Sequence, residues 1–146
     1  MNSLAALAYA SSVVLLFLKF VFAASLQGAT RIRTRSFQYA EDAAEWHGEV
    51  RAVESDLVVR AQRLLRNDGE SQPFYLAIGA IYVAVGAAPA AAPYYFGAYT
   101  LSRLAHAWFF LRPRQPHRSR AFALGLTVLC ALAVHTLVQC VAPFLR

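Results

Sequence analysis

Four apolar runs dominate the sequence, and each is long enough to cross a lipid bilayer as a helix. They cover about residues 4–28, 72–88, 94–112 and 121–144. Backbone N–H and C=O groups find no water in hydrocarbon, so a spanning segment must pair them internally, as a helix does. Only 15% of the 146 residues are charged and 58% are hydrophobic, which leaves too few charges for the surface of a soluble domain. The sequence therefore predicts an all-α integral membrane four-helix bundle that forms one domain over residues 1–146.

The first two runs need separate arguments. The stretch from about Leu4 to Leu26 is too long for the apolar region of a secretion signal, lacks a basic segment before it and contains Lys19. We therefore expect a retained transmembrane helix. The second run is short, but residues 54–72 before it contain no strong helix breaker except Gly69. One long helix, half in water and half in the membrane, is expected there.

The distribution of arginine predicts the topology. The net charge of +6 comes almost entirely from arginine, since Lys19 is the only lysine. Arginine is concentrated in RIRTR at 31–35 and in RPRQPHRSR at 112–120, whereas AAPAAAP at 87–93 carries no charge. With four spans, the first and third connections share one face of the membrane, which the positive-inside rule identifies as cytosolic. Both termini are then expected on the opposite face. A nucleic-acid-binding domain would also be basic, but not this apolar.

Acidic residues are confined to one part of the chain, since all eight lie between Glu41 and Glu70. Five later arginines therefore have no acidic partner within their own helix pair: Arg103, Arg112, Arg114, Arg118 and Arg120. We expect these arginines to pair with the first connection, with lipid phosphate or with an anionic ligand. Lipid phosphate is the preferred partner for Arg112, Arg114 and Arg120.

The two cysteines, Cys130 and Cys140, both lie in the last apolar run. Helix or lipid packing is the simplest expectation for them. Neither a disulfide framework nor the spacing of metal ligands is visible, so no metal site is predicted.

A polar strip precedes the second apolar run. Arg63, Arg66, Asn67 and Glu70 follow an i, i+3, i+4, i+7 pattern, which places them on one helix face at the membrane edge. One interpretation is a solvated face with an internal network from Arg63 to Glu70. The other is a binding strip for a zwitterionic ligand that carries carboxylates.

Ionisable residues inside the spans are further candidates. Arg103 and His106 lie three residues apart in the third run, and an arginine in hydrocarbon is costly unless it faces a polar cavity. A functional role is therefore the default hypothesis for this pair. For Lys19 in the first run and His135 in the fourth, pairing or hydrogen bonding within the bundle is the simpler expectation.

The segment PHRS at 116–119 places Arg118 and Ser119 at the start of the fourth helix. Backbone amides at a helix start and a guanidinium together make an electropositive pocket. A thiol held there would ionise more readily, because a nearby positive charge favours the charged form.

These residues resemble a known family. R-L-L-R-N-D-G-E at 63–70 fits the R-x-x-x-N-x-x-E signature of the MAPEG proteins, the membrane-associated proteins of eicosanoid and glutathione metabolism. The resemblance covers nearly the whole chain and is greatest to the subgroup of microsomal glutathione transferase and microsomal prostaglandin E synthase. Its supporting segments are RIRTRSF with AED at 31–42, VVRAQRLLRND at 58–68, RLAHAWF at 103–109 and RQPHRS at 114–119.

The resemblance implies a homotrimer that binds glutathione between subunits, in a pocket open to the cytosol. It implies contacts to glutathione from Arg31, Arg63, Arg66, Asn67, Glu70, His106, Arg118 and Ser119. Arg118 matches the arginine that stabilises the glutathione thiolate, and Ser119 matches its neighbouring serine. Asp42 matches a first-loop aspartate proposed to assist proton transfer in the prostaglandin synthase. Arg118, Ser119 and Asp42 are thus the implied catalytic residues.

The implied activity is glutathione-dependent transfer, in which the thiolate is conjugated to a lipophilic electrophile in the endoplasmic reticulum membrane. A glutathione peroxidase activity is compatible with the same site. One alternative is isomerisation of a lipid endoperoxide to prostaglandin E, which Ser119 favours whereas Phe122 favours the transferase. Another is a non-catalytic protein that presents lipids to a partner enzyme.

Three positions depart from the subgroup's pattern. Phe110 and Phe122 stand where tyrosines occur in the subgroup or in its synthase branch, and both lack the hydroxyl group. Pro73 lies three residues after Glu70 rather than the usual four, so we expect any kink of the second helix to be displaced.

Overall fold

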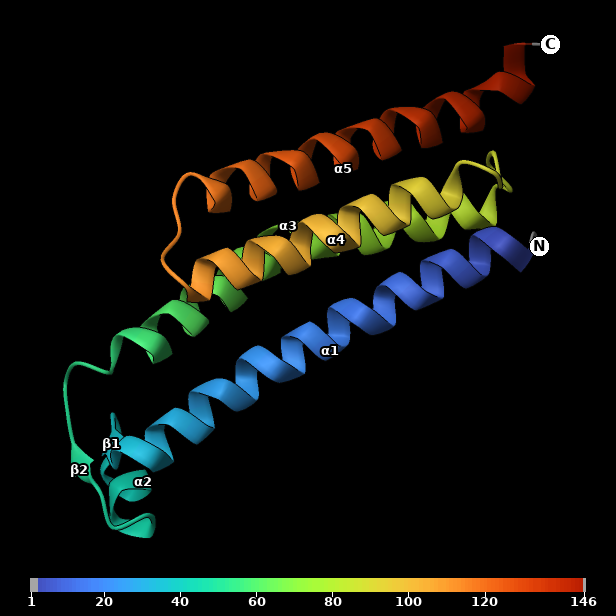
Figure 1. Ribbon diagram of the computed structural model, residues 1–146. Helices are drawn as coiled ribbons and strands as arrows, with labels where there is room; N and C mark the ends of the chain where they lie inside the picture. The colour runs from blue at the N-terminus through green and yellow to red at the C-terminus, as the bar shows by residue number, and fades with distance from the viewer. Residues whose placement is uncertain (1–2, 146) are drawn as a thin grey trace.

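The computed structural model describes residues 3–145 and confirms the all-α membrane bundle. Four long helices run alongside one another: α1 (Ser3–Thr34), α3 (Asp56–Ala84), α4 (Ala92–Leu111) and α5 (His117–Val141) (Figure 1). A short 3-10 helix, η1 (Ala142–Leu145), follows α5. Helix α1 begins and η1 ends at one end of the bundle, and the first and third connections lie at the other, as expected for four consecutive spans (Figure 1).

The four helices differ in how they meet the membrane. The segments Leu4–Thr34 and His117–Leu145 are long and apolar enough to cross it by length and composition. Helix α4 has 20 residues, which at about 1.5 Å per residue matches the roughly 30 Å hydrocarbon core. Helices α3 and α4 carry Asp68 and Arg103, whose side chains are buried. Three of the four long helices thus turn a charged side chain inward, since Lys19 of α1 is buried as well.

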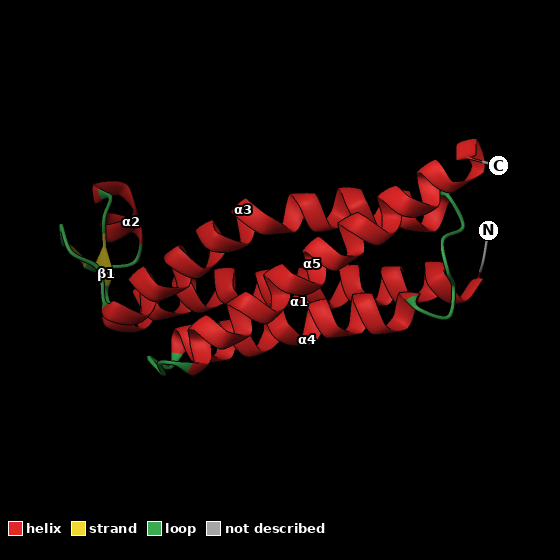
Figure 2. Ribbon diagram, turned by 90° about the horizontal axis from the view of Figure 1, so that it is seen from above, coloured by secondary structure: helices red, strands yellow, loops and turns green. Residues whose placement is uncertain are grey.

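The first connection is more structured than the sequence indicates. Helix α1 continues to Thr34, beyond the expected end near residue 28. The connection then contains α2 (Ala40–Glu45) between two short parallel strands, β1 (Ser36–Phe37) and β2 (Glu49–Val50) (Figure 1). Figure 2 shows α2 and β1 beyond the ends of the long helices. This small unit lies beyond the helix ends, at the face that carries most of the arginines.

Glycine permits two features of the long helices. Gly79 lies where α1 approaches α3, and a Cβ there would stand 2.6 Å from Cε2 of Tyr9. Gly86, with φ of +67°, reverses the chain after α3, in a conformation that side chains with a Cβ rarely adopt. Pro73 lies inside α3, and the helix runs continuously from Asp56 to Ala84 around it.

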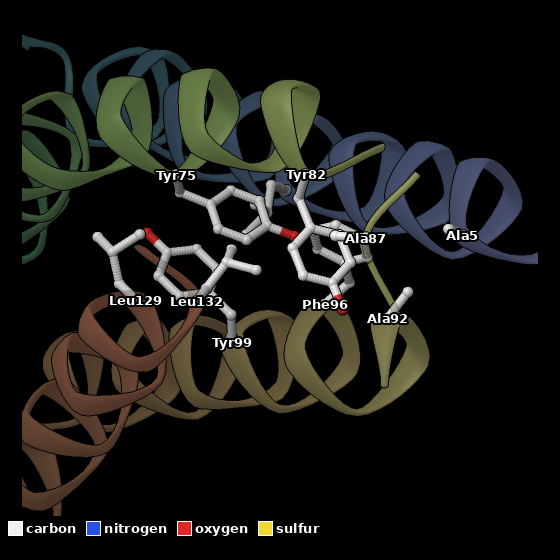
Figure 3. Packing of buried hydrophobic residues seen from close by; sticks show 10 residues of the cluster. Ala5, Tyr75, Tyr82, Ala87, Ala92, Phe96, Tyr99, Leu129 and Leu132 are labelled. Carbon is white, nitrogen blue, oxygen red and sulfur yellow. The ribbon is translucent and has the colours of Figure 1, made fainter. Parts of the chain in front are cut away.

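An aromatic cluster fills the half of the bundle nearer the chain ends. Tyr75 and Tyr82 of α3 interdigitate with Phe96 and Tyr99 of α4, and leucines of α5 cover them (Figure 3). The Tyr75 and Tyr99 rings stack with centroids 3.9 Å apart and an interplanar angle of 7°. Ser12 of α1 forms hydrogen bonds with the hydroxyl groups of Tyr75 and Thr100, both from other helices. Hydroxyl pairing of this kind satisfies polar groups that would otherwise be costly in a dry interior.

Candidate functional site

A cavity of about 420 Å³ opens in the half of the bundle nearer the arginine-rich connections. Three helices contribute its lining: Arg63 and Asn67 from α3, His106 and Phe110 from α4, and Arg118, Ser119 and Phe122 from α5. The volume lies within the usual range for small-molecule sites. The structure thus brings together five predicted site residues that are up to 56 positions apart, since Arg63 and Ser119 both line the cavity.

A buried ionic cluster lies behind the cavity and ties α1, α3 and α4 together. Nζ of Lys19 lies 2.7 Å from Oδ2 of Asp68, and Nη2 of Arg103 lies 2.8 Å from Oδ1 of the same carboxylate. All three side chains are at most 6% exposed. A carboxylate held between two cations is well compensated for its loss of hydration.

Arg103 does not line the cavity itself; its charge is paired with Asp68 in this cluster, and the functional role suggested by its place in the third run stays a prediction. The expectation that Lys19 pairs within the bundle is confirmed. Asp68 was not singled out from the sequence, although it is the charged residue between Asn67 and Gly69 of the signature. The signal that could have identified it is the need of every intramembrane cation for a nearby anion.

The ionic cluster also fixes Asn67. Nη2 of Arg103 donates to Oδ1 of Asn67 at 2.9 Å, in addition to its bond with Asp68. The amide oxygen is thereby occupied from behind, and Nδ2 is left as the donor available to a ligand.

His106 supplies a second polar group with a defined place. Its side chain is 3% exposed, and Nδ1 has no hydrogen-bond partner among residues 3–145. The imidazole packs against Phe110 at 5.4 Å and Phe122 at 5.7 Å between ring centroids. A buried polar atom without a hydrogen-bond partner is costly, so the position of this imidazole is unusual in a dry helix interface.

Arg118 and Ser119 lie in the first turn of α5, beside the loop that joins it to α4. Cζ of Arg118 lies 4.9 Å from the centroid of Phe110, so the guanidinium stacks on the cavity wall. The side-chain amide of Gln115, which the sequence did not indicate, contacts both residues. Loop residues of this kind carry no periodic signal, so only the folded loop reveals the contact.

Four other predicted residues do not line the cavity of the single chain. Arg66 and Glu70 are exposed on α3. Asp42 is exposed on α2, and Arg31 is paired with Glu54 at 2.5 Å between Nε and Oε1. One interpretation of the strip was an ionic network from Arg63 to Glu70. The ion pairs found within residues 3–145 include no such network.

The lining has a distinct chemical character. Its charged or titratable members are Arg63, His106 and Arg118, and no carboxylate is among its residues. Guanidinium groups bind carboxylates through paired hydrogen bonds, so the cavity suits an anionic ligand. Phe110 and Phe122 give the same cavity an apolar wall, where an oily molecule can lie against the bound anion.

Comparison with known proteins gives a consistent result. The model of the MAPEG family matches residues 9–138. A human protein named prostaglandin E synthase is 32% identical over 139 residues, covering 94% of this chain and 91% of its own. Proteins of the same name from Bos taurus and Canis lupus familiaris are each 32% identical over 122 residues, covering 82% of this chain and 79% of their own.

Proposed function

The chain belongs to the MAPEG family, and from this premise we propose that it is a membrane enzyme that conjugates the thiolate of glutathione to lipophilic electrophiles. The observation that carries the proposal is the cavity between α3, α4 and α5, in which arginine, amide and imidazole groups lie beside two phenylalanine rings. A water-soluble anion and an oily reactant can meet in such a place. Accompanying peroxidase activity would use the same thiolate.

Glutathione complements the polar lining. It carries two carboxylates, an ammonium group and a thiol, and Arg63 and Arg118 offer guanidinium groups to its acidic ends. The Nδ2 donor of Asn67 and the imidazole of His106 suit its amide groups.

The chemistry follows from the place of Arg118 and Ser119. A thiol beside a guanidinium loses its proton to water more readily, because the positive charge favours the thiolate. Sulfur then forms a bond to the electrophilic carbon, and the leaving group departs with its electron pair. Holding both reactants in one cavity supplies the orientation part of the rate. Since phenylalanine replaces tyrosine at 110 and 122, thiolate stabilisation depends on Arg118 and Ser119.

We further propose that the working form is a homotrimer in the endoplasmic reticulum membrane. Half of the polar strip, Arg66 and Glu70, is exposed and does not line the cavity of its own chain. The predicted roles of these residues, and those of Arg31 and Asp42, require a ligand held between neighbouring subunits. A glutathione site shared across a subunit interface would use both halves of the strip.

A second candidate function is isomerisation of a prostaglandin endoperoxide to prostaglandin E. The names of the similar proteins favour it, as does Ser119 beside Arg118 in the cavity lining. Assays of the purified protein with a chlorodinitrobenzene-type electrophile and with prostaglandin endoperoxide, each with glutathione, separate the two activities. Turnover of the endoperoxide alone would replace conjugation as the function.

Glutathione binding is the direct test of the proposal. We expect calorimetry on the detergent-solubilised protein to show binding, and Arg63→Ala to weaken it about tenfold, as loss of one charge-assisted contact predicts. Arg51→Ala is the matched control, because Arg51 is exposed and lies outside the cavity. A protein that neither binds glutathione nor is stabilised thermally by it would instead be the non-catalytic, lipid-presenting kind.

The cysteines provide a separate prediction. Cys130 is exposed and Cys140 half-buried on α5, and neither lines the cavity. Because the reactive sulfur belongs to glutathione, Cys130→Ser and Cys140→Ser should keep kcat/KM within about twofold of the native value, as surface changes away from a site usually do. A large loss in either variant would place the nucleophile on the protein.

A further inference from the structure

Gln115 stands immediately behind two cavity residues without lining the cavity itself. It lies in the connection between α4 and α5, and its side chain is exposed. With its amide oxygen toward Arg118, it accepts hydrogen bonds from Nε at 3.1 Å and Nη2 at 2.7 Å. Its amide nitrogen then donates to Oγ of Ser119 at 3.0 Å. The donors of Arg118 assign this orientation, because an amide nitrogen cannot accept from a guanidinium.

The contact leaves the useful part of Arg118 free. Nε and Nη2 lie along one edge of the guanidinium, so Gln115 engages two of its five N–H groups. The remaining three are available to a ligand in the cavity. The ring of Phe110 supports the guanidinium face, with Cζ of Arg118 4.9 Å from the ring centroid. The long side chain is thus held from two directions before any ligand arrives, which reduces the conformational entropy lost on binding.

Gln115, the residue that orients Arg118, is uncharged, and this decides how much positive charge Arg118 can offer to a ligand. The charged or titratable groups that face the cavity are Arg63 from α3, His106 from α4 and Arg118 from α5. No carboxylate pairs with Arg118 among residues 3–145, so its orientation does not come from an ion pair. An amide can orient the guanidinium and leave its full positive charge for an anionic ligand, whereas a carboxylate would largely cancel that charge.

We propose that Gln115 is a positioning residue that fixes Arg118 and Ser119 for stabilisation of the bound thiolate while preserving the charge of Arg118. This assignment rests on the proposed function, because it concerns the sulfur of glutathione in the same cavity. Preorganised donors of this kind stabilise developing charge more effectively than mobile ones.

Two substitutions distinguish positioning from a merely structural role. Gln115→Ala removes the anchor, and we expect kcat/KM to fall about five- to tenfold, as loss of one hydrogen bond to a charged group predicts. Gln115→Glu keeps the reach but adds a negative charge beside Arg118. We expect kcat/KM to fall further than in Gln115→Ala and the thiol of bound glutathione to ionise only at higher pH. The ultraviolet absorbance of the thiolate, measured across a pH series, reports this ionisation. Gln115→Ala adds no charge, so a residue that only stabilised the loop would leave the ionisation of the bound thiol unchanged in it, whereas loss of a positioning contact moves that ionisation to higher pH.

Gln38→Glu is the matched control, because it makes the same change of charge at an exposed glutamine of the first connection. It should leave thiol ionisation and kcat/KM unchanged. Unaltered thiol ionisation in Gln115→Glu would overturn the role of Gln115 but not the proposed function. Tighter glutathione binding in Gln115→Ala would do the same, because it would show that Gln115 competes with the ligand for Arg118. Failure of the native protein to bind glutathione would overturn the proposed function, and the role of Gln115 with it.

Discussion

Asp68→Ala is expected to lower the free energy of unfolding by about 3–5 kcal/mol, the cost of leaving buried charge without its partner. The carboxylate of Asp68 lies within 2.8 Å of both Lys19 and Arg103, and all three side chains are nearly inaccessible to solvent. The native cluster holds two cations and one anion, so the substitution leaves two cations facing each other in the bundle interior. Denaturant-induced unfolding in detergent micelles measures the loss.

Two comparison variants separate burial from ion pairing in general. Glu49→Ala breaks the exposed ion pair with Arg51, in which the arginine side chain is 61% exposed and the glutamate side chain 72%. It should lower the free energy of unfolding by less than about 1 kcal/mol. Lys19→Met leaves the neutral pair of Asp68 and Arg103, so we expect a much smaller loss than for Asp68→Ala. Native stability in Asp68→Ala would mean that water or a second chain neutralises the cluster.

The helical architecture could be predicted because the membrane leaves few alternatives. A span without internal hydrogen bonding is too costly, so four apolar runs led directly to four long helices. Helix ends were less predictable. Helix α1 continues through Arg31 and Arg33 to Thr34, and no glycine or proline marks that end in the sequence. The strands β1 and β2 have two residues each, too few to show a period, and their parallel pairing joins segments on either side of α2.

The candidate site was partly predictable. Arg63 and Asn67, four residues apart on one helix, share a face by geometry alone, and both line the cavity. That Arg66 and Glu70 of the same strip do not line it depends on how α3 is rotated against α4 and α5. Helix rotation is set by packing over the whole bundle, here by the stacked tyrosines of α3 and α4, and not by the strip itself.

The ionic cluster illustrates the limit of sequence reasoning. Its members come from α1, α3 and α4, and their meeting requires the relative heights of three helices to be known within about one turn. The sequence identified Lys19 and Arg103 as intramembrane cations but assigned Arg103 a functional role. The structure shows that Arg103 pairs with Asp68 and also donates to Asn67 at the cavity wall, a contact that the sequence did not reveal.

Arg118→Ala should have the largest effect on activity, with kcat/KM falling on the order of 100-fold or more, the cost typical of removing a group that stabilises developing charge. The guanidinium lines the cavity beside Ser119 and stacks on Phe110, where the thiolate of glutathione is expected. Phenylalanine at 110 and 122 supplies no hydroxyl donor to replace it. Initial rates with glutathione and a lipophilic electrophile give the ratio.

Arg120→Ala is the matched control, because Arg120 is exposed two residues along the same helix and lies outside the cavity. It should keep kcat/KM within about twofold of the native value, as exposed substitutions away from a site usually do. Arg118→Lys should have a kcat/KM between those of Arg118→Ala and Arg120→Ala. It keeps the charge but loses the planar guanidinium group, which can bind Gln115 and a ligand at the same time. If Arg118→Ala is folded and as active as Arg120→Ala, the thiolate is stabilised elsewhere, and the α5 wall of the cavity has no part in the chemistry.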